Sequence, residues 1–198
     1  MKEFNGKTAV VTGGSRGIGR EIVLMLAENG ARVAFNYLSN KDQADRLVEE
    51  VRANGGECLA AQADIRDGDA VKNWIADVRE KFDGLDILVN NAGIIRDKPL
   101  MMMLSDDWHD VIDTNLNGMY NAARACIVTF LKQRKGDIVN ISSLSGLIGL
   151  PGQTNYSSAK GAVNSFTKAL AKETAAYGVR VNAEIGRASC RERVYSGV

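Results

Sequence analysis

The sequence is poor in the residues that usually build metal centres, disulfide frameworks and hydrolytic triads. It contains one histidine, three cysteines and two prolines in 198 residues. Cys58, Cys126 and Cys190 are odd in number, far apart and outside any CxxC pattern, which argues against a disulfide framework or a zinc site. His109 has no second histidine or nearby cysteine as a partner, so neither a metal site nor a Ser-His-Asp triad is predicted. We interpret the thiols as buried or incidental and His109 as an exposed helix residue.

Net charge and long apolar runs are also missing. The 25 basic and 24 acidic residues nearly cancel, so no general attraction to nucleic acid or to an anionic membrane is expected. No apolar stretch approaches a membrane span, and the opening MKEFNGKTAVV lacks the apolar core of a signal peptide. We therefore expect a soluble, cytoplasmic protein that recognises ligands through local features. The length predicts one domain.

What is present is an alternation of short apolar runs with amphipathic stretches. The runs are continuous rather than alternating in polarity, as in strands buried on both faces. They are TAVVT (8–12), ARVAFNY (31–37), CLAAQAD (58–64), DILVN (86–90), DIVNIS (137–142) and VRVNA (179–183). Gly30 and the pair Gly55-Gly56 are expected to end the first two helices between them. The pattern predicts an α/β fold, a Rossmann-like doubly wound parallel sheet with helices on both faces.

A glycine-rich turn, TGGSRGIG (12–19), follows the first predicted strand and opens a helix. Gly13, Gly17 and Gly19 would let backbone N–H groups approach a phosphate at a helix N-terminus, where the dipole favours negative charge. Arg20 follows where a P-loop has lysine, so a dinucleotide is the better candidate ligand. A tight structural turn would also favour glycine, but the strand before and the helix after raise the functional interpretation above chance.

The second predicted strand bears on the choice of dinucleotide. NAD-binding units usually carry an acidic residue about 20 positions after the glycines, where it binds the ribose 2′-hydroxyl. Here the strand ends Asn36-Tyr37-Leu38-Ser39, without a carboxylate. Arg16 and Ser39 are instead able to bind a 2′-phosphate, which favours NADP(H). The alternative is that Arg16 is simply solvated.

A tyrosine and a lysine lie four positions apart in YSSAK (156–160). Side chains at this spacing share one helix face, and Tyr156 and Lys160 fall at the edge of the apolar stripe, as expected for groups that face a cleft. The preceding strand delivers Ser142 and Ser143 to its carboxyl end, where open α/β sheets bind ligands. Most such pairs are solvated surface residues, so the pair alone does not establish a catalytic site.

Together, these motifs resemble the short-chain dehydrogenase/reductase family. They are TGGSRGIG, Asp64-Ile65, NNAG (90–93), Asn115, Ser143 and Tyr156-Ser-Ser-Ala-Lys160. Ser143 precedes Tyr156 by 13 positions and Asn115 precedes it by 41, as in the family. The resemblance covers residues 1 to about 183. Within the family, NNAGIIRDKPL and DIVNISSLSGLIGLPGQTNYSSAKGA most resemble the 3-oxoacyl-[acyl-carrier-protein] reductases, with acetoacetyl-CoA reductases close behind.

The resemblance implies that Tyr156 donates a proton to the substrate carbonyl as hydride arrives from the nicotinamide. Lys160 would hydrogen-bond the nicotinamide ribose, and a nearby ammonium is expected to lower the pKa of the tyrosine because it stabilises the phenolate. Ser143 would hold the carbonyl oxygen where negative charge develops. Ser142 and Ser145 are the nearby alternatives, and only the spacing rejects them.

The same resemblance implies two further sets of residues. Asn115 would support a water relay that resupplies the proton. The residues expected to bind NADP(H) are Gly13, Ser15, Arg16, Gly17 and Ile18 at the pyrophosphate, Asp64 and Ile65 beside the adenine, Asn91, Ala92 and Gly93 along the cleft, and Tyr156 with Lys160, in addition to Ser39, which the second strand suggests for the 2′-phosphate.

The implied function is NADPH-dependent reduction of a 3-oxoacyl thioester, linked to acyl carrier protein, in fatty acid biosynthesis. An acetoacetyl-CoA reductase, another secondary alcohol or sugar dehydrogenase of the family, and an inactive nucleotide-binding fragment stay open as alternatives. Lys132, Arg134 and Lys135 form a basic cluster that either docks an acidic carrier or is a solvated helix end. Met101, Met102 and Met103 either line an acyl pocket or fill the core.

The end of the chain departs from the family. After VRVNA the relatives continue with a Pro-Gly turn, a substrate lid and a last strand, whereas this chain reads EIGRASCRERVYSGV (184–198). We therefore expect an incomplete reductase domain over 1–183, which lacks the lid and the last strand, and a disordered non-family tail over 184–198. On this interpretation neither the homotetramer usual in the family nor turnover by this chain is assured.

Overall fold

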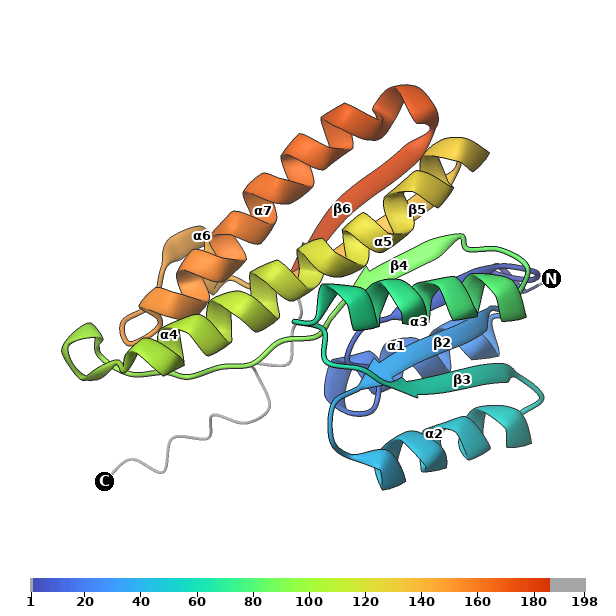
Figure 1. The fold of residues 1–198 in the computed structure, drawn as a ribbon, viewed down its shortest axis with the longest axis horizontal. Coiled ribbons are helices and arrows are strands. Elements are labelled where there is room, and N and C mark those ends of the chain that lie inside the picture. The colour runs from blue at the N-terminus through green and yellow to red at the C-terminus, as the bar shows by residue number, and fades with distance from the viewer. Residues whose placement is uncertain (1, 186–198) are drawn as a thin grey trace.

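A computed structural model describes residues 2–185 as one six-stranded parallel sheet with helices on both faces (Figure 1). The spatial order of the strands is β3-β2-β1-β4-β5-β6, so the chain reverses direction across the sheet beside β1. The strands are β1 (Thr8–Val11), β2 (Arg32–Tyr37), β3 (Glu57–Gln62), β4 (Ile87–Asn90), β5 (Gly136–Ser142) and β6 (Val179–Ile185). The predicted doubly wound parallel sheet is confirmed.

The helices alternate with the strands along the chain. Asn40 and Asp67 cap the second and third helices by accepting hydrogen bonds from backbone N–H groups of the first turn. The helical segments are α1 (Gly17–Glu28), α2 (Lys41–Ala53), α3 (Gly68–Lys81), η1 (Leu100–Met102), α4 (Ser105–Ile112), η2 (Asp113–Asn117), α5 (Gly118–Gln133), α6 (Ser145–Ile148), α7 (Thr154–Thr174) and η3 (Ala175–Tyr177). Gly30 and Gly55 follow the ends of α1 and α2 with φ of +94° and +77°, so both predicted caps are confirmed.

The six apolar runs of the sequence are the six strands, with ends that differ by no more than two residues. The observed end of β6 differs from the predicted end, because Glu184 and Ile185 continue the strand pairing opposite Ile141 and Ser142. The last strand therefore ends two residues beyond the predicted boundary at 183. The rest of the predicted tail, residues 186–198 with Cys190, lies outside the described residues.

Two layers of helices bury the two faces of the sheet. On one face α1 and α2 pack Val23, Leu47 and Val51 against Phe35 and its neighbours. On the other face α3, α5 and α7 pack around Trp74, Phe130 and Ile138, and Figure 1 shows these three helices on the same side of the sheet. Because apolar side chains cover both faces of the central strands, β1 and β4 are wholly buried and carry continuous apolar runs, whereas β6 at the edge has only Val179 and Val181 buried.

A row of buried polar side chains crosses the second face at the carboxyl ends of the strands. Asn90 of β4 donates from Nδ2 to Oδ1 of Asn140 on β5 (2.8 Å). Asn140 donates from its own Nδ2 to Oγ1 of Thr167 on α7 (2.9 Å). The hydroxyl of Thr167 donates in turn to the carbonyl oxygen of Val163 (2.8 Å). Buried amides need such partners, so this row fixes β4, β5 and α7 relative to one another.

The cysteines and the histidine within residues 2–185 lie where the sequence predicts them. Cys58 and Cys126 are buried, and His109 is an exposed residue of α4, as predicted. Residues 2–185 contain no group of three or more metal-ligating side chains. None of the helices in that range is long and apolar enough to cross a membrane.

The packing of Phe130 predicts the stability of the core. Its side chain is fully buried, and its ring lies so close to the start of β5 that a Cβ atom added at Gly136 would be 2.4 Å from it. Phe130→Ala should lower the free energy of unfolding by about 3–5 kcal/mol because the cavity cannot collapse fully. Val128→Ala, on the exposed side of the same helix, is the control and should change it by less than about 1 kcal/mol. Urea denaturation measures both; equal losses would contradict this packing.

Candidate active site

The glycine-rich loop joins β1 to α1 at the carboxyl edge of the sheet. Gly13 has a φ of +65°, and a Cβ atom there would lie 2.9 Å from Cα of Ala92, so only glycine fits. Gly17 begins α1 with a φ of +55°, and a Cβ atom there would meet no atom within 4 Å. Arg16, at the N-cap, makes no side-chain capping bond. The first-turn N–H groups of α1 are therefore available to an anionic ligand.

Two asparagines tie this loop to the sheet. Asn36, at the end of β2, accepts from the N–H of Gly13 (3.0 Å) and donates to the carbonyl oxygen of Ala63 (2.8 Å). Asn91 donates to the carbonyl oxygens of Thr12 and Gly13, both at 3.0 Å. The sequence analysis noted only that no carboxylate stands at the end of this strand and gave Asn36 no role. The available signal was a polar residue inside a continuous apolar strand, since a buried amide needs hydrogen-bond partners.

A cleft of about 710 Å³ opens between the loop and the ends of β2, β3 and β4. Eleven of the thirteen residues predicted to bind the cofactor line it: Gly13, Ser15, Arg16, Gly17, Ile18, Ser39, Asp64, Ile65, Asn91, Ala92 and Gly93. Tyr156 and Lys160 do not line it. They lie on α7, which adjoins the loop after β4, where Asn155 donates to the carbonyl oxygen of the cleft residue Arg96 (3.0 Å). The cleft volume is typical of ligand sites.

Arg66, Arg96, Asp110 and Thr114 also line the cleft, although sequence reasoning did not single them out. The guanidinium of Arg66 donates to the Asp64 carboxylate (2.7 Å) and contacts that of Asp110 (3.3 Å). Hydrogen bonds from Arg66 hold the pKa of Asp64 below its ordinary value. An ionised carboxylate can only accept hydrogen bonds, and both oxygens of Asp64 accept from Arg66, which fixes the carboxylate at the wall of the cleft.

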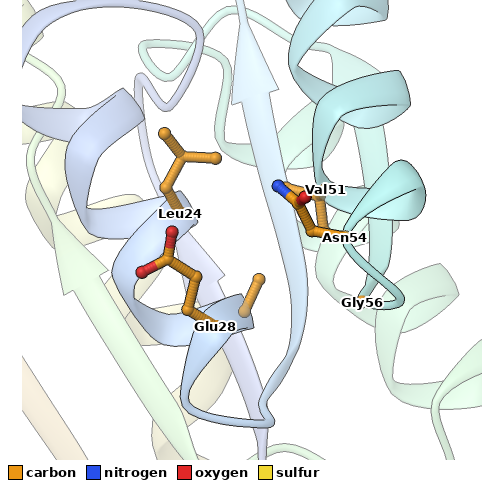
Figure 2. A pocket seen from close by; sticks show the side chains of 6 residues that line it. Leu24, Glu28, Val51, Asn54 and Gly56 are labelled. Atoms are coloured by element: carbon orange, nitrogen blue, oxygen red, sulfur yellow. The ribbon is translucent and has the colours of Figure 1, made fainter.

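A second hollow lies between α1 and the end of α2, lined by Leu24, Glu28, Val51, Asn54 and Gly56 (Figure 2). Its volume is about 10 Å³. A cavity of that size holds about one water molecule, so it is not a ligand site.

The three candidate serines after β5 have different surroundings. The hydroxyl of Ser142 is buried and donates to Oδ1 of Asn164 (2.6 Å). The hydroxyl of Ser145 is buried and donates to Oε1 of Gln153 (2.7 Å). Ser143 is partly exposed, and its hydroxyl lies near enough to the phenol of Tyr156 to oppose the rise in the pKa of that phenol. The structure thus favours Ser143 for a physical reason that the spacing alone did not supply.

Tyr156 and Lys160 lie on one face of α7, as predicted. Nζ of Lys160 is 5.7 Å from the centre of the tyrosine ring and donates to the carbonyl oxygen of Ile141 (2.6 Å). Burial lowers the pKa of Lys160 to about 8. Burial also raises the pKa of Tyr156, against the effect of the Ser143 hydrogen bond and together with the charge of Asp97. The pKa of Tyr156 is therefore raised here and not lowered as predicted, because burial of the phenol outweighs the hydrogen bond from Ser143.

Asn115 lies in η2, a single π-helical turn between α4 and α5. Such turns interrupt the regular α-helical ladder and recur at functional sites. Nδ2 of Asn115 donates to the carbonyl oxygens of Ile94 and Val111, both at 2.9 Å. Its Oδ1 is buried and has no hydrogen-bond partner within residues 2–185. A buried acceptor of this kind suits a bound water or ligand, so the water relay stays a prediction that the geometry allows.

The surroundings of the basic cluster and of the methionines narrow the alternatives predicted for each. Lys132, Arg134 and Lys135 precede β5, so they lie at the amino edge of the sheet, about 20 Å along the strand from Ser143. Arg134 donates to a backbone carbonyl near Tyr177, and Lys135 lies 3.6 Å from the Asp86 carboxylate. These contacts favour the solvated helix end over carrier docking. Met101 and Met102 are exposed, which excludes core filling for both.

The buried ammonium predicts an unusual dependence of stability on pH. Lys160 binds a proton less readily in the folded protein, with a pKa of about 8 against an ordinary 10.5. Between these values only the unfolded chain holds the proton, so stability rises with pH there. Relative to Lys160→Met, the wild-type free energy of unfolding should rise by roughly 3 kcal/mol across that interval.

Urea denaturation at several pH values measures this effect. Lys168→Met is the matched control, because Lys168 is an exposed lysine of the same helix, and it should keep the wild-type pH dependence. An identical pH dependence in the wild type and Lys160→Met would contradict the depressed pKa.

Comparison with known proteins agrees with this arrangement. The sequence matches the family described as short chain dehydrogenase over residues 7–185. It is 50% identical over 177 residues to the 3-oxoacyl-[acyl-carrier-protein] reductase FabG of Staphylococcus aureus, covering 89% of this chain and 72% of the relative. The 3-oxoacyl-[acyl-carrier-protein] reductase of Synechocystis sp. is 47% identical over 183 residues, covering 92% and 74%.

The fold is also found among solved structures. The crystal structure of gox2181 superposes with a TM-score of 0.86 at 36% sequence identity, covering 90% of this chain and 70% of that one. The relatives named above belong to the group that the NNAG and YSSAK segments resemble. This chain therefore belongs to the short-chain dehydrogenase family.

Proposed function

We propose that this protein reduces 3-oxoacyl thioesters, carried by acyl carrier protein, to 3-hydroxyacyl thioesters with NADPH. Family membership implies a nicotinamide nucleotide cofactor, and the named relatives supply the substrate class. The observation that carries the proposal is the meeting of Ser143, Tyr156 and Lys160 at the carboxyl edge of the sheet, beside the glycine-loop cleft. Reduction of this ketone belongs to fatty acid biosynthesis.

The residues present fit a bound dinucleotide. The loop is open at Gly17, where a Cβ atom would meet no atom within 4 Å, and the first-turn N–H groups of α1 are suited to the pyrophosphate. Arg16 and Ser39 line the same cleft, where a guanidinium and a hydroxyl would hold a 2′-phosphate. When bound, the nicotinamide supplies the hydride.

The protein's own side chains supply and stabilise the proton that the carbonyl oxygen receives. The raised pKa of Tyr156 keeps its proton on the phenol at neutral pH, which is the form that an acid needs. A carbonyl oxygen that gains negative charge is far more basic than a phenolate, so transfer from Tyr156 is favourable. Ser143 donates to the same oxygen and stabilises its charge. Lys160 holds a buried positive charge beside the phenol, and this charge opposes the cost of forming phenolate.

Three finer expectations stay predictions. They are the water relay through Asn115, the cytoplasmic location, and the failure of this chain to form the homotetramer usual in the family. The candidate activities are distinguished by comparing turnover of three kinds of substrate. These are a 3-oxoacyl thioester on acyl carrier protein, acetoacetyl-CoA, and simple secondary alcohols or sugars. Each candidate activity should turn over a different one of them fastest.

Loss of the Tyr156 hydroxyl should abolish reduction without changing the fold. Tyr156→Phe should lower kcat by about a thousandfold, because no other group supplies the proton to the carbonyl oxygen. The matched control is Tyr177→Phe at the opposite edge of the sheet, which should keep wild-type kcat. The assay is NADPH oxidation at saturating acetoacetyl-CoA. A Tyr156→Phe variant with wild-type kcat would contradict the assigned role.

Arg16 should determine the preference for the phosphorylated cofactor. Arg16→Gln should raise the KM for NADPH about tenfold to hundredfold and leave the KM for NADH within twofold, because one charge-assisted hydrogen bond to the 2′-phosphate is lost. Arg20→Gln is the control, since Arg20 pairs with Glu21 and Glu50 and does not line the cleft. Equal changes for both cofactors would contradict NADP selectivity through Arg16.

A further inference from the structure

A chain of hydrogen bonds links the loop after β4 to the turn that carries Ser143. Asp97 accepts at Oδ2 from Nε2 of Gln153 (2.7 Å), and Gln153 accepts at Oε1 from the hydroxyl of Ser145 (2.7 Å). The backbone N–H of Ser145 then donates to Oγ of Ser143 (3.2 Å). Gln153 and Ser145 are each 5% exposed. The proposed reaction gives neither of them a chemical role.

The direction of each hydrogen bond follows from the carboxylate. An ionised carboxylate accepts and cannot donate, so Gln153 must turn its amide nitrogen toward Asp97. Its carbonyl oxygen then faces Ser145, whose hydroxyl has to donate. Oγ of Ser143 accepts from the backbone N–H of Ser145, a group that can only donate. The hydroxyl proton of Ser143 is consequently left for a different acceptor, namely the phenol of Tyr156 or the oxygen of the substrate carbonyl.

We propose that Asp97, Gln153 and Ser145 are positioning residues that hold the Ser143 hydroxyl proton toward the reacting oxygen. The inference rests on the proposed reduction, in which Ser143 donates to the carbonyl oxygen. A donor stabilises developing charge only when it is already aimed at that charge, and small displacements are costly. Gln153 lies at the start of α7, and its amide bonds Asp97 of the loop and Ser145 of the turn. This one amide therefore links three segments around the site.

Gln153→Leu is the informative variant, because it removes both hydrogen bonds and changes no charge. The charged groups around Tyr156, namely Lys160 on α7 and Asp97 on the loop, are kept. We expect kcat for the 3-oxoacyl thioester to fall about tenfold to hundredfold, with KM within threefold. Gln133→Leu is the control, since Gln133 bonds two backbone carbonyls at the amino edge of the sheet. It should keep wild-type kcat.

The Ser143→Ala background separates positioning from a general loss of structure. If Gln153 acts through Ser143, then Gln153→Leu should change kcat by less than twofold in a chain that already lacks the serine hydroxyl. An equal fold-loss in both backgrounds would overturn the proposal, because Gln153 would then act independently of Ser143.

Titration of the phenol tests the same point without substrate or cofactor. Tyr156 ionisation is followed by ultraviolet difference absorption against the Tyr156→Phe chain. Gln153→Leu, Ser143→Ala and their double variant should raise the pKa of Tyr156 by the same amount, because each removes the serine donor to the phenolate. An unchanged titration in Gln153→Leu overturns the inference. A wild type that reduces no 3-oxoacyl thioester would contradict the proposed function, and the titration would still decide the positioning.

Discussion

The hydrogen bonds from Asn90 to Asn140 and from Asn140 to Thr167 are the constraint on which the site depends. They join β4, β5 and α7 at the edge where three functional segments begin. The NNAG segment leaves β4, the Ser143 turn leaves β5, and α7 carries Tyr156 with Lys160. Buried amides bond only in defined geometry, so this row sets the relative position of groups that are far apart in the chain. Parallel strands alone would bring these segments to one edge without fixing the spacing of their side chains.

Burial shifts the pKa values of Tyr156 and Lys160, the proposed catalytic pair, in opposite directions. The same low-polarity surroundings lower the pKa of Lys160 to about 8 and raise that of Tyr156. A protonated phenol is suited to carbonyl reduction, whereas alcohol oxidation would require the phenolate first. The electrostatics of the site therefore agree with the reductase direction. Ser143 matters in the same way, since its hydrogen bond lowers the pKa of Tyr156 and so opposes the effect of burial.

The fold was predictable from the sequence because strands covered on both faces carry unbroken apolar runs, and β1 and β4 are wholly buried. The glycine loop and the YSSAK pair were also readable, since each is local in sequence. The hydrogen-bond partners of Asn36 and Gln153 were not readable, because Gly13 lies 23 residues from Asn36 and Asp97 lies 56 residues from Gln153. The direction of the Tyr156 pKa was misjudged for a related reason: an i, i+4 spacing shows that an ammonium is near, but it does not show how deeply the phenol is buried.

The most direct test of the central claim is the mass of the product. The wild-type chain is incubated with a 3-oxoacyl thioester on acyl carrier protein and with NADPH, and the carrier is examined by mass spectrometry. The account predicts a gain of two hydrogen atoms per thioester, equal in amount to the NADPH consumed. A folded chain that binds NADPH but leaves the mass of the acyl carrier protein unchanged would contradict it.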